Sequence, residues 1–345
     1  MRLPDIPSID STAANAAAQR QTTLTKPLGS LGFLEELSVK LAGITANPKP
    51  TFSKKGVIVM AADHGIAIDG VSAYPPEVTT QMVYNFLNGG AAINVLTRQA
   101  NAKVTVVDIG VAHDFQNIPG MLHRKIAFGT QNMLHGPAMT RAQAEDAIQV
   151  GLEVVSDEID HGLDLVATGE MGIGNTTPSS AITAALTGAP VRQVVGRGTG
   201  LDDQGLANKI RAISAALDRN QPDPRDPLDV LAKVGGLEIA GLCGVILGAA
   251  SRRIPVVVDG FISGAAVLVA ARLQPAVKAF LIASHQSVEI GHAVIWEDLG
   301  LRPILDLGMR LGEGTGAVLA FHILEAAVRL LNEMATFSEA GVSDK

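Results

Sequence analysis

The segment GVIVMAADHG, residues 56–65, is a short run of apolar, mostly β-branched residues that ends in a polar turn. Runs of this length, bounded by turn residues, are typical of buried β-strands. The same pattern recurs along the chain in KVTVVDIG (103–110), LDLVATGEMGIGN (163–175), IPVVVDGF (254–261), AFLIASHQS (279–287) and PILDLGMRLGEG (303–314). We therefore expect these runs to be the strands of one sheet.

Helical patterns lie between the strands, as in EVTTQMVYNFLNGGAAINVLTRQ (77–99) and TRAQAEDAIQVGLEVVSDEI (140–159). Strands that alternate with helices imply right-handed βαβ units and a parallel sheet. The apolar content, mostly Ala, Val, Leu and Gly, is typical of such a sheet with helices on both faces. The sequence thus predicts an α/β fold. The proline-rich segment NQPDPRDPLDVL (220–231) is expected to be a connecting loop.

The two ends of the chain are expected to be helical. Residues 1 to about 50 have helical character with an N-cap at Ser11 or Thr12, and 317 to about 337 has apolar residues at helical spacing. We expect these terminal helices to pack together as a small layer beside the sheet. No internal repeat and no low-complexity linker separates them from the rest.

Composition excludes several classes of protein. The 345 residues carry a formal charge of −7 and no run of Lys or Arg, which argues against a nucleic-acid partner. The mean hydropathy is +0.27, but the most apolar stretches, 241–251 and 256–271, are too short for a membrane span or are interrupted by Asp259. The N-terminus has no apolar core of a secretory signal, and the single Cys243 allows no intrachain disulfide. We expect a cytoplasmic protein with no membrane partner.

Polar side chains gather where the predicted strands end. In parallel sheets, ligands bind beyond the carboxyl ends of the strands. The sequence therefore predicts a pocket at this edge, with a rim formed by Asp63, His64, Asp108, Glu170, Asn175, Asp259, Ser284, His285 and Glu313.

Glycine-rich loops precede helices in GEMGIGNTTPSSAI (169–182), GRGTGLDDQGLANKI (196–210) and GEGTGAVLA (312–320). Glycine lets backbone N–H groups approach a phosphate, and the N-terminus of the following helix favours the negative charge. Any one of these loops can be an ordinary tight turn, but three at one sheet edge favour a phosphorylated ligand. The Walker pattern is absent and the third glycine of a dinucleotide fingerprint is displaced, so neither ATP nor a dinucleotide is indicated.

Glu313 stands among Gly312, Gly314 and Gly316 directly before an apolar helix. A carboxylate there can simply offset the helix macrodipole. However, a capping role needs no flanking glycines, whereas a ligand closing over bare backbone does, and a shielded Glu is a credible general base. Glu170 lies in similar glycine-rich surroundings. Among the histidines, His64 and His285 are candidates for substrate contact, and no metal-binding spacing such as H-E-x-x-H is present.

Several motifs, in order, resemble the nicotinate-nucleotide–dimethylbenzimidazole phosphoribosyltransferase family. They include KPLGSLGFLEEL (26–37), MAADHGIA (60–67), ASHQS (283–287), MRLGEGTGAVLA (309–320) and the glycine loop at 169–182. The resemblance implies transfer of the 5-phosphoribosyl group from nicotinate mononucleotide to 5,6-dimethylbenzimidazole, giving α-ribazole 5′-phosphate for cobalamin. It also implies a Rossmann-like α/β domain (51–316), a small helical domain (1–50 with 317–345), a homodimer, and neither metal nor cofactor.

The resemblance also implies roles for individual residues. Glu313 would be the general base, and Glu170 a second carboxylate in the base pocket. Phosphate and ribose would be held by Met171, Gly172, Gly174, Asn175, Thr176, Lys209, Ser284, Gly312, Gly314 and Gly316.

The sequence departs from the family pattern at the base pocket. Tyr74 and Met82 stand where some family members have serine and glutamine, which alters the pocket wall. Two alternatives therefore remain: a related phosphoribosyltransferase with a different aromatic acceptor, and a non-catalytic nucleotide-binding protein.

Overall fold

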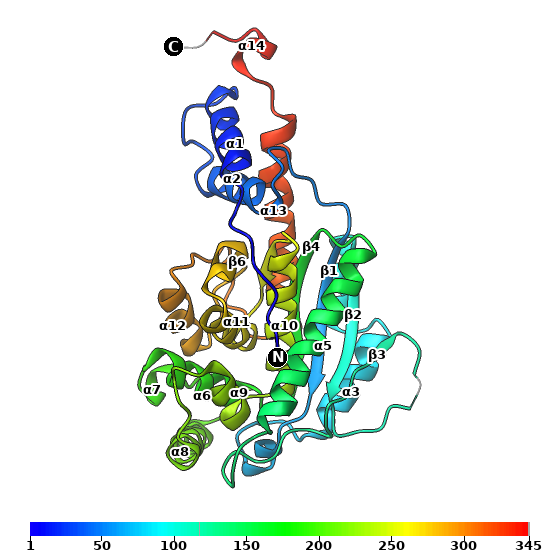
Figure 1. The fold of residues 1–345 in the computed structure, drawn as a ribbon, viewed down its shortest axis with the longest axis vertical. Helices are drawn as coiled ribbons and strands as arrows, with labels where there is room; N and C mark the ends of the chain where they lie inside the picture. Colours follow the sequence, from blue (N-terminus) through cyan, green and yellow to red (C-terminus); the bar gives the residue numbers. More distant parts are fainter. Residues whose placement is uncertain (117, 344–345) are drawn as a thin grey trace.

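The structure is a computed structural model that describes residues 1–116 and 118–343 of the chain. Its centre is a six-stranded sheet, all parallel, in the order β3-β2-β1-β4-β5-β6 (Figure 1). The strands are β1 (Lys55–Ala62), β2 (Ala102–Gly110), β3 (Met121–His123), β4 (Leu165–Met171), β5 (Val256–Val258) and β6 (Leu281–Ala283). The predicted α/β fold with a parallel sheet is confirmed.

The sheet differs from the prediction at two places. The segment 303–314 is not a strand: within it only Leu305 forms a bridge, to His285, and Gly308, Gly312 and Gly314 adopt positive φ, which breaks an extended chain. Conversely, the edge strand β3 was not predicted. With three residues paired only to β2, it is too short to show an alternating apolar pattern.

Helices cover both faces of the sheet, and the alternation of side chains along β1 shows why. Ile58, Met60 and Ala62 belong to one apolar cluster, and Val57 and Val59 belong to another on the opposite face. The first cluster is completed by helices α5 (Arg141–Asp160), α6 (Thr176–Thr187), α7 (Val191–Val194), α8 (Asp203–Asn220), α9 (Pro227–Val234), α10 (Leu237–Ser251), α11 (Phe261–Leu273) and α12 (Ile290–Leu299). The second is completed by α2 (Phe33–Thr45), α3 (Glu77–Leu87), α4 (Ala92–Gln99) and α13 (Thr315–Glu333).

Short helical segments connect these elements. The 3-10 turns are η1 (Gly65–Asp69) and η2 (Pro275–Phe280), and α14 (Phe337–Ala340) lies near the C-terminus. The segment predicted as a proline-rich loop is a loop only in its first part, because α9 begins at Pro227. A proline at the first helical position has no N–H to leave unpaired, and the Asp226 carboxylate caps the helix by accepting from the Leu228 and Asp229 N–H groups.

The terminal helices pack side by side. Helices α1 (Ser11–Thr23) and α2 lie against the half of α13 that extends away from the sheet (Figure 1). The N-cap of α1 is Asp10, whose carboxylate accepts from Ala13 N at 2.7 Å, and not Ser11 or Thr12 as predicted. The Arg20 guanidinium donates to Leu331 O at 2.6 Å, which joins α1 to the end of α13.

Helix α13 contacts both the sheet and the terminal helices. It begins at Thr315, so the predicted domain boundary at 316/317 falls inside it, and the division into two domains stays a prediction.

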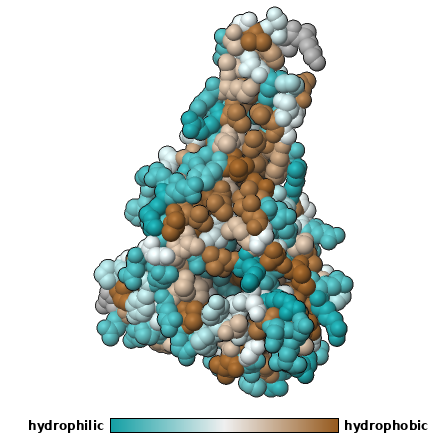
Figure 2. All heavy atoms as spheres, turned by 180° about the vertical axis from the view of Figure 1, so that it is seen from behind, coloured by the Kyte–Doolittle hydropathy of each residue, from teal (hydrophilic) through white to brown (hydrophobic). Residues whose placement is uncertain are grey.

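Among the described residues, α13 is also the one helix long and apolar enough to cross a membrane, although 56% of that stretch is buried inside the protein. The stretches 241–251 and 256–271 form the buried helix α10, strand β5 and helix α11, as expected. Apolar side chains gather along the narrow part of the molecule in Figure 2.

Candidate active site

A cavity of about 490 Å³ opens beyond the carboxyl ends of β4, β5 and β6. It brings together most of the residues to which the sequence assigned a site role. Of these, the cavity is lined by Tyr74, Met82, Glu170, Met171, Gly172, Asn175, Thr176, Gly312 and Glu313. His285, a candidate for substrate contact, lines it as well.

The backbone around Glu313 is held in an unusual conformation. Gly312, Glu313 and Gly314 have φ of 85°, 64° and 92°, so three successive residues are left-handed, and for Glu313 this costs about 1–3 kcal/mol. A Cβ at Gly314 would lie 2.6 Å from Val57 Cγ2, and one at Gly312 would lie 2.2 Å from Glu170 Oε1. Both flanking positions therefore require glycine, and the turn presents Glu313 to the cavity.

Asp259 fixes this turn from below. Its two carboxylate oxygens accept from Gly314 N at 3.1 Å and Ala317 N at 3.0 Å, which ties the turn to the first residues of α13. Asp259 is itself buried, and His285 Nε2 lies 3.7 Å from its Oδ1. Asp259 therefore holds the turn that carries Glu313, and burial raises the pKa of the Asp259 carboxyl.

Glu313 is 5% exposed, and its carboxylate makes one hydrogen bond among the described residues, in which Oε2 accepts from Ile93 N at 3.1 Å. Ile93 is in the first turn of α4, so Glu313 faces the positive end of that helix. Burial raises the pKa of Glu313, the Ile93 N–H opposes this rise, and Asp259 adds to it, so that the net shift is upward. A carboxylate with a raised pKa in a cavity is suited to accept a proton.

Glu170 is the second buried acid that lines the cavity. It is 6% exposed, and Asn175 Nδ2 donates to its Oε2. Burial, with added repulsion from Asp259 and Glu238, raises the pKa of Glu170 to about 8. Glu170 is therefore mostly a neutral acid at pH 7 and can donate a hydrogen bond.

A basic group, Lys209, lies behind the part of the cavity wall that Thr176 and Gly198 form, and does not itself line the cavity. Lys209 on α8 is fully buried, and its Nζ donates to Thr176 Oγ1 at 2.6 Å, at the N-terminus of α6. Burial lowers the pKa of Lys209 to about 8, and the charge of Glu289 opposes that shift. A Cβ at Gly198 would lie 2.9 Å from Thr176 Oγ1, so this glycine leaves room for the pair. A cation, a hydroxyl and a helix N-terminus together suit a phosphate.

Some predicted site residues lie behind the cavity wall. Ser284 is fully buried and its Oγ donates to Val258 O at 2.5 Å. A Cβ at Gly316 would lie 2.1 Å from His285 Cδ2, so Gly316 makes room for that ring. Gly174 and Gly314 likewise support turns and do not line the cavity. These positions do not line the cavity, and their role in binding stays a prediction.

The cavity also contains residues that the sequence analysis did not assign. Ser287 is in the quoted motif ASHQS and Arg310 is in the quoted motif MRLGEGTGAVLA, so both could have been found there, whereas Glu289 carries no recognisable signal of its own. The unassigned lining residues are Val78, Ile173, Gly198, Thr199, Gly260, Phe261, Ile262, Ser287, Glu289, Arg310 and Leu311.

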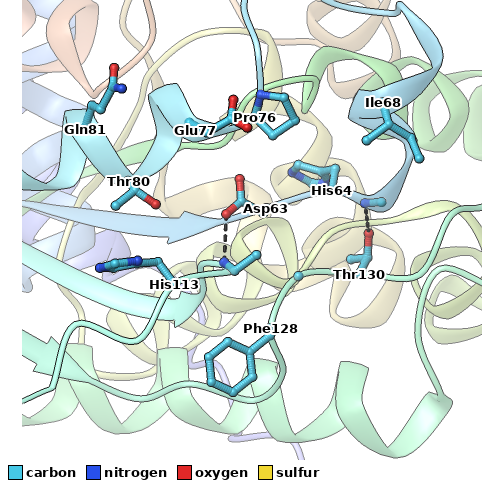
Figure 3. A pocket seen from close by; sticks show the side chains of 13 residues that line it. Asp63, His64, Ile68, Pro76, Glu77, Thr80, Gln81, His113, Phe128 and Thr130 are labelled. Carbon is cyan, nitrogen blue, oxygen red and sulfur yellow. Dashed lines mark hydrogen bonds between the residues drawn. The ribbon is translucent and has the colours of Figure 1, made fainter.

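A second cavity of about 500 Å³ lies on the other side of α3 (Figure 3). Asp63 and His64, predicted for the rim of a single pocket, lie here and not in the first cavity. Asp63 Oδ2 accepts from Ala112 N at 2.7 Å, and His64 Nε2 lies 2.9 Å from Glu238 Oε1. Asp108 lines neither cavity and pairs with Lys125 at 2.8 Å. The predicted rim is thus divided by α3.

Within residues 1–116 and 118–343, no group of three or more His, Cys, Asp or Glu side chains is arranged to hold a metal ion.

Comparison with known proteins identifies the family. Residues 6–342 match the sequence profile of a phosphoribosyltransferase family. The chain is 62% identical to the nicotinate-nucleotide–dimethylbenzimidazole phosphoribosyltransferase of Chloroflexus aggregans, over 98% of this chain and 96% of the relative. It is 57% identical to the enzyme of the same name from Geobacter sulfurreducens, over 99% of this chain and 97% of that relative.

A solved structure agrees with the sequence comparison. The crystal structure of CobT from Thermus thermophilus superposes with a TM-score of 0.94 at 48% identity, covering 97% of this chain and 100% of that one. Because sequence and fold agree over nearly the whole chain, the protein is an enzyme of the pentosyltransferase class and belongs to the nicotinate-nucleotide–dimethylbenzimidazole phosphoribosyltransferase family.

Proposed function

We propose that this protein transfers the 5-phosphoribosyl group from nicotinate mononucleotide to 5,6-dimethylbenzimidazole, with Glu313 as the general base. The products are α-ribazole 5′-phosphate and nicotinate. The relatives named for this reaction support the choice of substrates. The observation that carries the proposal is the buried Glu313 carboxylate, held at the cavity on a left-handed turn that both flanking glycines make possible.

The reaction needs one proton acceptor. The bond between C1′ and the pyridinium nitrogen breaks, and the nitrogen keeps the electron pair and becomes neutral. One benzimidazole nitrogen forms the new bond to C1′, and the other nitrogen loses its proton to the Glu313 carboxylate. Inversion from β to α places attack and departure on opposite faces of the ribose. The transition state resembles an oxocarbenium ion, as in glycoside hydrolysis.

Protonation assigns different roles to the two cavity acids. Glu170 has a pKa of about 8, so at pH 7 it is protonated in most protein molecules and cannot accept the proton there. Burial raises the pKa of Glu313, which makes its carboxylate a stronger base, and the Ile93 N–H opposes that rise. Environments that separate two pKa values separate acid from base. Glu170 then serves as a neutral hydrogen-bond donor to the bound ligand.

The phosphate is proposed to lie at Lys209, Thr176 and the N-terminus of α6. Gly172 and Gly174 shape the loop that leads to this helix. A Cβ at Gly172 would lie 2.4 Å from Ala62 O, and Gly174 has a φ of 87°. Both positions therefore favour glycine, and the loop that they form leads to the helix N-terminus proposed to bind the phosphate.

A different aromatic acceptor is the second candidate function. Tyr74, Val78 and Met82 on and before α3 line the cavity and give it a mostly apolar wall. This wall suits a methylated benzimidazole, and the Tyr74 hydroxyl offers a partner to a more polar base. The choice between acceptors therefore rests on these side chains.

The test is to incubate the purified protein with nicotinate mononucleotide and, separately, 5,6-dimethylbenzimidazole, benzimidazole, adenine and a phenol. Nicotinate release and the new nucleotide are measured by chromatography. We expect the highest kcat/KM with 5,6-dimethylbenzimidazole. A higher value with another base would support the alternative acceptor, and donor binding without nicotinate release from any mixture would support a non-catalytic nucleotide-binding protein.

The family resemblance also leads us to propose a cytoplasmic homodimer. Large apolar side chains are exposed close to the cavities at Ile68, Tyr74, Phe128 and Leu311, with exposures of 77%, 54%, 64% and 58%. Exposed apolar groups of this kind mark interaction surfaces. Sedimentation equilibrium at micromolar concentration would give the mass of two chains, and a single-chain mass would refute the dimer.

A further inference from the structure

Glu289 is an acidic residue in the wall of the first cavity for which the reaction described so far has no use. It is 6% exposed, and its Oε2 has no hydrogen-bond partner among the described residues. A Cβ at Gly196 would lie 2.0 Å from that oxygen, so the backbone packs directly against the carboxylate. A buried carboxylate without partners is costly, and such groups are normally paired.

A structural role does not account for Glu289. It occupies the N-cap position of α12, but its side chain makes no capping hydrogen bond. The nearby Lys209 ammonium donates to Thr176 Oγ1, although the Glu289 charge reaches it through space. The carboxylate thus remains available for a ligand in the cavity.

The turn that carries Glu289 is firmly held. Ser287 N donates to His292 Nδ1 at 3.0 Å, and Val288 N donates to Met309 O at 3.1 Å. Burial, with the charge of His285 in addition, lowers the pKa of His292 well below its usual value, so the ring is neutral and its Nδ1 can accept. Glu289 N in turn contacts Ser287 Oγ at 3.3 Å. The backbone that carries Glu289 is therefore held in place before a ligand binds.

The chemistry of the surroundings selects the ligand group. A carboxylate repels a phosphate, and Lys209 with Thr176 already provides the proposed phosphate site nearby. The groups next to the phosphate in a ribonucleotide are hydroxyls, which donate hydrogen bonds. Dinucleotide-binding folds use an acidic residue in the same way to bind ribose hydroxyls.

We propose that Glu289 accepts hydrogen bonds from the ribose hydroxyls of the donor nucleotide and thereby selects ribonucleotides over deoxyribonucleotides, an inference that rests on the proposed function. Glu289 is then a specificity-determining residue.

The experiment compares nicotinate mononucleotide with its 2′-deoxy and 3′-deoxy analogues, using 5,6-dimethylbenzimidazole as acceptor. The proteins are the unmodified chain, Glu289→Ala, Glu289→Gln and the control Glu297→Gln, an exposed position on the same helix. We expect the unmodified chain and the control to prefer the ribonucleotide over at least one analogue by about 10- to 100-fold in kcat/KM, as for hydrogen bonds to a charged group.

In Glu289→Ala this preference should shrink at least tenfold, through a higher KM for the ribonucleotide. Glu289→Gln keeps one carbonyl acceptor, so its preference for the ribonucleotide should lie between those of Glu289→Ala and the unmodified chain. The intrinsic effect of a missing hydroxyl on reactivity is the same for every variant and cancels in the comparison. The inference would be overturned if Glu289→Ala kept the same preference for the ribonucleotide, or if Glu297→Gln lost as much of that preference as Glu289→Ala. In either case, turnover by the unmodified chain would still support the proposed function. Absence of turnover by the unmodified chain would overturn both.

Discussion

At the scale of single residues, Glu313 has two possible roles that one substitution separates. Glu313→Gln keeps an oxygen that can accept from Ile93 N but cannot take a proton. If the carboxylate is the base, kcat should fall by about 10²- to 10⁴-fold. Affinity for nicotinate mononucleotide, measured by calorimetry, should change little.

If Glu313 only offsets the dipole of α4, the same substitution costs about 0.3–1 kcal/mol of stability and leaves turnover intact. Urea unfolding of both proteins measures that cost. Near-normal turnover by Glu313→Gln would contradict its assignment as the base.

Glu170 makes stability depend on pH. Its pKa is about 8 in the folded chain against an ordinary value of 4.5, so between these pH values the folded chain binds a proton that the unfolded chain has lost. Stability therefore falls as the pH rises through this window, by about 3–5 kcal/mol in total. Glu170→Gln removes this contribution.

The free energy of unfolding, measured in urea at pH 5 and pH 8, should consequently drop less for Glu170→Gln than for the unmodified chain. The control is Glu297→Gln, whose exposed side chain should leave the pH dependence as it was. An identical drop in all three proteins would show that Glu170 is ionised in the folded chain at neutral pH.

At the scale of elements, α5 and α10 are in backbone contact. A Cβ at Gly244 of α10 would lie 2.0 Å from Ile148 O of α5, and a backbone carbonyl cannot turn aside as a side chain can. Alanine gains about 1 kcal/mol of helix propensity over glycine, but forcing the helices apart costs more. Gly244→Ala should therefore lower the free energy of unfolding by about 1–3 kcal/mol in urea titration.

The control for this substitution is Gly136→Ala, where an added Cβ meets nothing within 4 Å. That variant should stay within about 0.5 kcal/mol of the unmodified chain. A higher free energy of unfolding for Gly244→Ala would show that α5 and α10 can move apart without a cost in stability.

The elements also show what the sequence could predict. The buried strands and long helices were predicted because apolar runs and helical spacing follow directly from burial, as in β1 and α5. The prediction for the segment 303–314 was wrong because Ile304 and Leu305 are apolar for packing reasons while the glycines after them bend the chain. Local pattern does not distinguish these cases.

The site was only partly predictable for a related reason. The residues around Glu170 and Glu313 stand in conspicuous glycine loops, and the structure places both in one cavity. Glu289 is on an ordinary polar turn, and only the folded chain shows that this turn faces Lys209. The division of the rim by α3 depends on tertiary packing, which strand-end positions do not reveal.

At the scale of the whole molecule, the two ends of the chain close on each other. Leu24 and Thr336 form an antiparallel bridge, and α13 runs from the Glu313 turn to this contact. The cavity, the sheet face and the terminal helices are thus linked through one helix. Because α13 links all three, we expect them to unfold together.

The single Cys243 can report on that event. It lies on α10, fully buried, and burial raises the pKa of its thiol, so it cannot form a reactive thiolate in the folded chain. A thiol reagent should therefore label it only as fast as the protein unfolds. The logarithm of the labelling rate should rise with urea concentration as steeply as global unfolding does. Local opening of α10 would make the labelling rate depend only weakly on urea concentration.

Ligand binding should then protect this thiol at a distance from the cavity. Nicotinate mononucleotide binds the folded chain and not the unfolded one, so at 100 times its Kd the unfolded population, and with it the labelling rate, should fall about 100-fold. The rate is followed by absorbance of the released thiol product, with nicotinate riboside, which lacks only the phosphate, as the matched weaker ligand. Equal labelling with and without nucleotide would mean that α10 opens independently of the cavity, and the linkage through α13 would be wrong.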